Sequence, residues 1–232
     1  MKIPTRFKTS IRRIRDVRKY VGNNRTFRQF VNQYDMVYFG KVNHKDEAQL
    51  VRGITMSHSK TDQHYCVGSA YGRDMILLQR SDHLLGAQGS EHENYTWNIL
   101  AIDLKDNINL PHTYIEGRHR HGVGFYAELS MRERSWVELP PHFIGEYSQK
   151  FRKNYVVRMP NYYATVFSSI VTPLVGEQLA HYFGMFDYEL FDDTLYVYYL
   201  AKVPSLERLD YMVKAGVWLA SEVEKSYTNN IR

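Results

Sequence analysis

Hydrophobic residues near the start of the chain recur at steps of four, three, three and four: Phe7, Ile11, Ile14, Val17 and Val21. Residues at this spacing share one face of a helix. The remaining surface of that helix is basic, because the residues between them include Arg12, Arg13, Arg15, Arg18 and Lys19. The pattern therefore predicts a basic amphipathic helix that Gly22-Asn-Asn24 ends. A second short helical stripe follows over residues 27–34.

From residue 36 the pattern changes to runs typical of strands. Such runs occupy residues 36–42, 50–57, 64–71, 73–80, 95–104 and 109–118. The third and fourth of them flank Gly72, which predicts a hairpin. Residues 81–94 are polar and contain glycine and histidine, so we expect a loop there.

The second half of the chain mixes both periods. Strands are predicted over residues 136–139 and 154–159, and a hairpin over 185–191 and 194–200 around Asp192-Asp193. Helices are predicted over residues 162–171, from Thr172-Pro173 to about Tyr182, and from about Pro204 to Ser226. This order of elements indicates an α+β fold with a largely antiparallel sheet and packing helices.

The domain organisation follows the same pattern. Residues 1–24 form the basic amphipathic arm, and residues 25–232 form the α+β body. Two subdomains are a further option within the body, over residues 25–132 and 133–232.

Composition is that of an ordinary globular chain, with 44% hydrophobic and 24% charged residues. Cys66 is the single cysteine, which excludes an internal disulfide and a cysteine zinc site, and it is expected to be a small buried hydrophobe. A reducing compartment follows. We find no apolar run suited to a membrane span and no secretory signal, so the sequence indicates a cytoplasmic protein.

Charge is distributed unevenly along the chain. Residues 1–30 contain ten Lys or Arg and one acid, Asp16, for a net charge of +9. The whole chain carries +5, so residues 31–232 carry −4. A basic arm therefore precedes a mildly acidic body, and Arg12, Arg13, Arg15, Arg18 and Lys19 are its expected contacts with an anion or a membrane.

The stretch YIEGRHRHGVGFY, residues 114–126, contains the candidate ligand site Arg118, His119, Arg120 and His121. On a strand both imidazoles would share one face and could bind Zn²⁺, but His83, His92, His112, Glu116 and His142 stand at no known ligand spacing. The two arginines and the glycine amides could instead hold an anion. A solvated strand end that runs into a turn at Gly122–Gly124 explains the same residues, so we assign no metal and no cofactor.

Catalytic motifs are weak. Ser57-His58-Ser59 and Ser81-Asp82-His83 place triad residue types side by side, but neighbours in sequence rarely have triad geometry, and no Gly-x-Ser-x-Gly elbow occurs. Asp187, Glu189, Asp192 and Asp193 surround the predicted hairpin, and the Asp192-Asp193 pair there is typical of turn chemistry. No residue is assigned a catalytic role.

Several segments in a fixed order resemble a bacterial family of domain-of-unknown-function type, with similar sequences in ultra-small candidate-phylum bacteria. The matching segments are FRQFVNQYDMVYFG, YCVGSAYGRDMILLQR, NILAIDLKDNINLPHTYIEGR, FRKNYVVRMP, VTPLVGEQL and FDYELFDDTLYVYY, with a C-terminal helix. The resemblance covers roughly residues 27–222. It implies a fold type and transfers no activity, substrate or site residue.

These observations predict a non-catalytic binding or scaffolding module that its basic helix attaches peripherally to the inner membrane face or to a partner protein. Three alternatives stay open. The apolar side of the helix could pack on its own body. The arm could bind nucleic acid, which the acidic body disfavours. The protein could be an enzyme or an anion- or metal-binding protein that uses His119 and His121.

Overall fold

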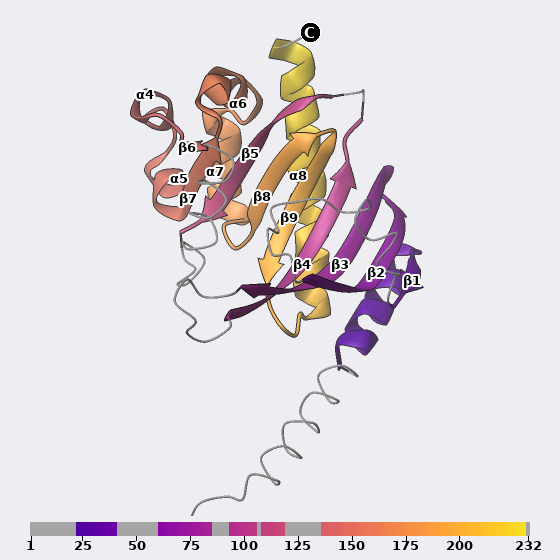
Figure 1. Cartoon of the computed structure of the whole chain (residues 1–232). Coiled ribbons are helices and arrows are strands. Elements are labelled where there is room, and N and C mark those ends of the chain that lie inside the picture. Colours follow the sequence, from indigo (N-terminus) through magenta and orange to yellow (C-terminus); the bar gives the residue numbers. More distant parts are fainter. Residues whose placement is uncertain (1–21, 41–59, 85–92, 106–107, 119–135, 231–232) are drawn as a thin grey trace, which may run out of the picture.

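The computed structural model describes residues 22–40, 60–84, 93–105, 108–118 and 136–230. Within them, nine strands form one sheet in the order β1-β2-β3-β4-β9-β8-β5-β7-β6, and each neighbouring pair is antiparallel (Figure 1). The strands are β1 (Val37–Phe39), β2 (Lys60–Ala70), β3 (Arg73–Leu84), β4 (Glu93–Asp103), β5 (Leu110–Gly117), β6 (Val137–Glu138), β7 (Tyr155–Met159), β8 (Asp187–Asp192) and β9 (Thr194–Leu200). The predicted α+β class and the largely antiparallel sheet are confirmed.

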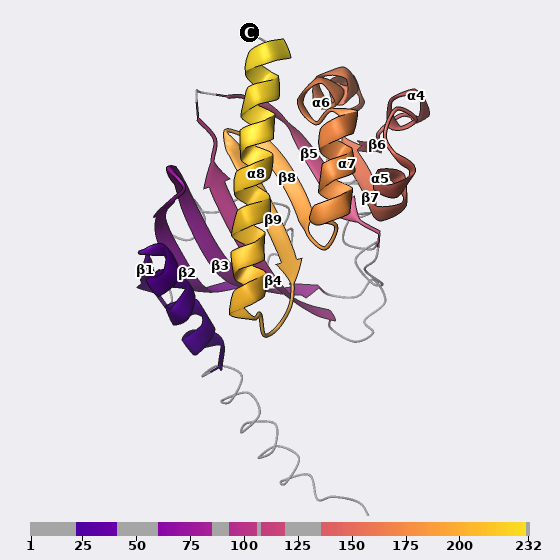
Figure 2. The same cartoon turned by 180° about the vertical axis from the view of Figure 1, so that it is seen from behind.

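The helices of the described chain cover one face of this sheet (Figure 2). They are a helix over residues 22–34, α4 (Pro141–Ile144), α5 (Gln149–Asn154), α6 (Ala164–Ile170), α7 (Pro173–Tyr182) and α8 (Leu206–Asn230), with a 3-10 turn, η1, over Asn161–Tyr163. The longest, α8, crosses β4 and β9 at the middle of the sheet. The predicted basic helix over residues 7–21 lies outside the described residues.

Two hydrophobic clusters follow from the alternation of side chains along each strand. On β4, Leu100 and Ile102 point toward the helices and join the larger core. Trp97 and Ile99 point to the opposite face, where they pack with Tyr198 and other side chains in a second buried cluster. Both faces of the central strands are therefore buried, and we call the one opposite the helices the second face.

The topology joins distant parts of the sequence. The hairpin of β8 and β9 lies between β4 and β5, so strands from residues 25–132 and 133–232 alternate within one sheet. The boundary of the predicted two-subdomain division lies within residues 119–135, outside the described part, and the division itself stays a prediction.

Both predicted hairpin turns are confirmed. Tyr71 and Gly72 join β2 to β3 with φ of 54° and 70°, and Asp192 has φ of 54° between β8 and β9. These left-handed conformations suit glycine and aspartate in tight turns. The loop predicted over residues 81–94 is wrong at its ends, because β3 runs on to Leu84 and β4 begins at Glu93, with Asp82 paired opposite Tyr95. Polar composition was misleading there because Asp82 is fully buried in the sheet.

The helix stop predicted at Gly22-Asn-Asn24 is also wrong, since residues 22–34 are helical. Tertiary bonds outweigh the low helix propensity of asparagine at this point. The Asn23 amide donates to Gln79 Oε1 at 3.0 Å and to the Lys202 carbonyl oxygen at 2.9 Å, which fixes the helix to the body.

Capping chemistry places the helices of the second half. Thr172 caps α7 as predicted, because its hydroxyl accepts from the Val175 N–H at 3.4 Å and Pro173 occupies the first turn. Ser148 does the same for the short helix α5, accepting from the Phe151 N–H at 3.2 Å. The sequence pattern did not indicate α5, which is too short to show a periodic stripe.

His64 occupies an irregularity in β2, where the pairing with β3 shifts between Gln63 and Cys66. Its φ is 59°, its ring is buried and stacks on Phe27 at 4.7 Å, and its Nδ1 lies 2.7 Å from the Tyr38 hydroxyl. Burial lowers the pKa of His64 from 6.5 to about 4, because desolvation penalises the charged ring.

This shift predicts a loss of stability in mild acid. His64 of the unfolded chain binds a proton below pH 6.5, whereas His64 of the folded chain binds one only near pH 4. The contribution of neutral His64 to the free energy of unfolding is therefore complete above pH 6.5 and declines as the pH falls toward 4. We expect a loss of about 2 kcal/mol across that window. Urea unfolding at about pH 7.5, 5.5 and 4.5 measures the loss of stability, which should be smaller for the His64→Asn variant than for the parent. Asparagine suits this position because it tolerates the positive φ. Equal losses in parent and variant would contradict the assignment.

Candidate functional site

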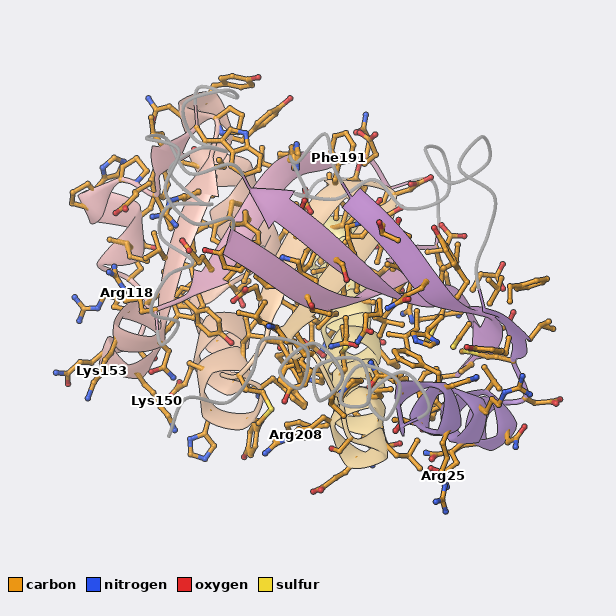
Figure 3. The ribbon with its side chains drawn as sticks, turned by 60° about the horizontal axis from the view of Figure 1, so that its bottom comes forward. Arg25, Arg118, Lys150, Lys153, Phe191 and Arg208 are labelled. Carbon is orange, nitrogen blue, oxygen red and sulfur yellow. The ribbon has the colours of Figure 1, made fainter. Side chains whose placement is uncertain are left out.

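Arg118 is the described member of the predicted ligand site, and it is held at the junction of β5 and β7. Its backbone N–H donates to the Asn154 carbonyl oxygen at 2.7 Å. Its Nε donates to the carbonyl oxygens of Arg152 at 3.2 Å and Tyr155 at 3.1 Å. The side chain is exposed, beside Lys150 and Lys153 of α5 (Figure 3). His119, Arg120, His121 and the Gly122–Gly124 turn lie outside the described residues, so that site stays a prediction.

The five arm residues predicted to contact an anion or a membrane are also outside the described part: Arg12, Arg13, Arg15, Arg18 and Lys19. Of the further histidines considered as metal ligands, His112 contacts Glu189 and His142 is exposed on α4. Within the described ranges, no group of three or more His, Cys, Asp or Glu side chains is arranged to hold a metal ion.

A row of buried ionisable groups crosses the second face of the sheet, and sequence reasoning missed it. It begins on β2 and β3, where Asp62 and Arg80 are paired opposite each other. Arg80 Nε donates to Asp62 Oδ1 and its Nη2 to Oδ2, both at 2.6 Å, and the Tyr65 hydroxyl donates to Oδ2 at 3.2 Å. Both charged side chains are almost completely buried. Burial alone would lower the pKa of Arg80, but the hydrogen bonds and charge of Asp62 hold it above its usual value.

Glu189 of β8 is the centre of the row. It is fully buried, one carboxylate oxygen contacts His112 Nε2, and the other accepts from the Tyr198 hydroxyl. The His112 ring lies between Trp136 at 4.5 Å and Phe191 at 4.3 Å. An aromatic enclosure therefore surrounds this carboxylate–imidazole contact.

The row continues toward β5 and β7. Asp187 Oδ1 accepts from the Gly117 N–H at 2.8 Å, and its Oδ2 accepts from the Tyr114 hydroxyl at 3.3 Å. Arg158 donates to Glu116 and, at 3.3 Å, to Glu138. Burial lowers the pKa of Arg158. These carboxylates bind side chains and amides of neighbouring strands, and their chemistry is that of a polar network that fixes strand register.

The two acidic pairs of the β8–β9 hairpin separate into different roles. Asp187 and Glu189 belong to the buried network, whereas Asp192 and Asp193 are exposed at the turn. The prediction of turn chemistry is confirmed for the second pair. The first pair had no predicted role; alternate residues of β8 point to the second face, and both acids are buried there. Cys66 is buried and free, as predicted, and burial raises the pKa of its thiol.

A groove lies at the end of the second face near the β2–β3 and β8–β9 turns. It has a volume of about 450 Å³, an apolar floor that includes Ile76 and Tyr196, and the carboxylates of Asp74 and Asp103 at its rim. Burial and then the like charges of Asp193, Asp74 and Glu224 raise the pKa of Asp103. This end of the body is therefore acidic.

Comparisons with known proteins give one informative likeness. No protein-family model matches the sequence, and no curated protein matches it. The structure is similar to the crystal structure of the mycobacterial trehalose monomycolate transport factor A, TtfA, with a TM-score of 0.57. The match covers 89% of this chain and 94% of that chain, at 10% sequence identity. The likeness is one of fold.

Fold alone does not carry a function from one protein to another. The resemblance to a bacterial domain-of-unknown-function family stays a prediction. Among the helices that the structure describes, none combines the length and the apolar character needed to cross a lipid bilayer.

Proposed function

We propose that the protein is a non-catalytic binding or scaffolding module that is attached peripherally to an anionic membrane surface through its basic N-terminal segment. The observation that carries this proposal is the charge distribution, because residues 1–30 hold a net charge of +9 on a chain whose remainder carries −4. Basic amphipathic segments of this kind bind anionic lipid surfaces reversibly.

The described end of the basic segment supports the proposal. In the helix over residues 22–34, Phe27, Phe30 and Val31 are buried against the body. Arg25 and Arg28 of the same helix are exposed. The body thus holds this helix by its apolar side and leaves its basic side available to a surface.

The second face supports a binding module over an enzyme. Asp62, Glu116 and Glu189 bind Arg80, Arg158, His112 and Tyr198, so these buried groups serve the sheet itself. The similar fold of a protein named as a transport factor supports an accessory role as well.

A full-length variant tests the attachment. We expect Gln at positions 12, 13, 15, 18 and 19 to lower partitioning onto phosphatidylserine-containing vesicles at low salt by at least about a hundredfold. Each removed charge takes away part of the attraction to the lipid surface. Co-sedimentation measures the effect, with phosphatidylcholine vesicles as the neutral control. Sedimentation of the variant at the level of the parent, or failure of the parent to sediment, would sink the proposal.

A further inference from the structure

Cationic residues lie near one end of the sheet, where β5 and β9 end and β7 begins, and Figure 3 labels five of them. They come from five separate parts of the sequence: Arg25, Arg118, Lys150, Lys153, Lys202 and Arg208. All are exposed except Arg208, which is half-buried in the first turn of α8.

Hydrogen bonds and side-chain contacts place these elements side by side. The start of the helix over residues 22–34 is joined to the β9–α8 connection by the bond from Asn23 to the Lys202 carbonyl oxygen, at 2.9 Å. α5 meets the end of α7 through Lys150 Nζ and His181 Nδ1, which are 2.8 Å apart. Arg118 binds the backbone at the junction of α5 and β7. These contacts bring the elements that carry the cations to the same end of the body, which we call the basic end.

The basic end keeps its charge because its cations have other partners than carboxylates. Arg118 binds backbone carbonyl oxygens, Lys150 binds an imidazole, and Arg208 Nη1 lies 2.9 Å from the Met185 sulfur. The ion pairs among the described residues use different cations: Arg73, Arg80, His112, Arg158 and Lys214. Glu207, which is exposed, and Asp210 line the same pocket as Arg208 and offset part of the positive charge there.

Two exposed apolar side chains share this end. Tyr182, the last residue of α7, is 60% exposed, and Val203, in the β9–α8 connection, is 52% exposed. The Tyr182 carbonyl oxygen accepts from the Tyr211 hydroxyl, which fixes the backbone while the ring points outward. A tyrosine ring with an apolar body and a polar tip suits the headgroup level of a bilayer.

We propose that the basic end is a docking surface for an anionic lipid bilayer, with Tyr182 and Val203 at the headgroup level. The inference rests on the proposed function and adds the surface on the body that meets the lipid. Charge polarity favours this orientation, because Asp74, Asp103 and Asp193 lie at the opposite ends of the strands and are repelled by the same lipid. The helix over residues 22–34 begins at this end, where Asn23 donates to the Lys202 carbonyl oxygen.

The test compares two charge-matched variants of the full chain. Lys150→Gln/Lys153→Gln removes two charges from the basic end, and Lys105→Gln/Lys225→Gln removes two exposed charges near the acidic end. We expect the first to lower partitioning onto phosphatidylserine-containing vesicles by roughly 20- to 30-fold, and the second by less than about twofold. Circular dichroism checks that both variants are folded.

The outcomes separate the two proposals. Equal effects of both variants, with binding still lost in the arm variant, would overturn the docking surface and leave arm attachment standing. Failure of the parent chain to bind anionic vesicles would overturn both the docking surface and the arm attachment. Retardation of duplex DNA by the parent, lost in Lys150→Gln/Lys153→Gln and without any vesicle binding, would assign the basic end to nucleic acid instead.

Discussion

Replacement of Asp62 by Ala is expected to lower the free energy of unfolding by about 3–5 kcal/mol. The carboxylate makes two bonds of 2.6 Å to Arg80, whose side chain is fully buried. Removal of one member of such a pair leaves a buried charge without its counter-ion, and the cost exceeds the net worth of the pair. Urea denaturation monitored by tryptophan fluorescence measures the change.

Two further variants separate this explanation from general damage to the sheet. Asp62→Leu/Arg80→Met removes both charges and should recover most of the loss, since a buried pair can be replaced by apolar residues at small cost. Lys214→Ala removes the exposed partner of Asp210, a pair at 2.8 Å, and should change stability by less than about 1 kcal/mol. A double variant as unstable as Asp62→Ala would contradict the charge argument.

Gly216→Leu is expected to destabilise the fold by about 3 kcal/mol, because α8 lies against the sheet at this residue. A Cβ at position 216 would lie 2.4 Å from Ile102 Cδ1, 3.1 Å from Val197 Cγ2 and 3.5 Å from Leu100 Cδ2. Ile102 Cδ1 is the end of a flexible side chain and can move away from a Cβ, but a whole leucine side chain must also displace Val197 and Leu100. Thermal and urea unfolding measure the loss.

The matched control is Gly22→Leu. A Cβ at Gly22 meets nothing within 4 Å, so the same substitution introduces no overlap there. We expect a change of less than about 0.5 kcal/mol. Similar losses for the two variants would mean that loss of glycine, rather than contact between α8 and the sheet, causes the effect.

The fold class and most element positions followed from the sequence because the signals were local. Alternation gave β4, the Thr172-Pro173 pair gave the start of α7, and turn residues gave two hairpins. The order of strands did not follow, because nothing local indicates that β9 pairs with β4. The extension of β3 past residue 80 was missed because its polar side chains are buried by distant parts of the fold.

Prediction of the candidate sites shows the same division. The basic segment could be identified by counting charges, because the net charge of a segment depends only on its composition. The Asp62–Arg80 pair was invisible, since the two residues lie on different strands and become partners only through the register of β2 and β3. The basic end was missed for a similar reason, as its cations come from segments that only the fold brings together. Charged residues alternate with apolar ones along β8, which marks a polar face of that strand, but the same pattern is typical of a solvated face and does not indicate its burial.

The position of β9 beside β4 has a consequence for synthesis of the chain. β4 ends at Asp103, and its partner β9 begins at Thr194, about 90 residues later. Ribosomes need on the order of 5–20 s to make that stretch, during which one edge of β4 has no strand to pair with. Open edges of this kind recruit other chains. A nascent chain that stalls before residue 194 therefore exposes the middle of its own sheet, and a cell that makes this protein must keep that edge from meeting another copy until the β8–β9 hairpin arrives.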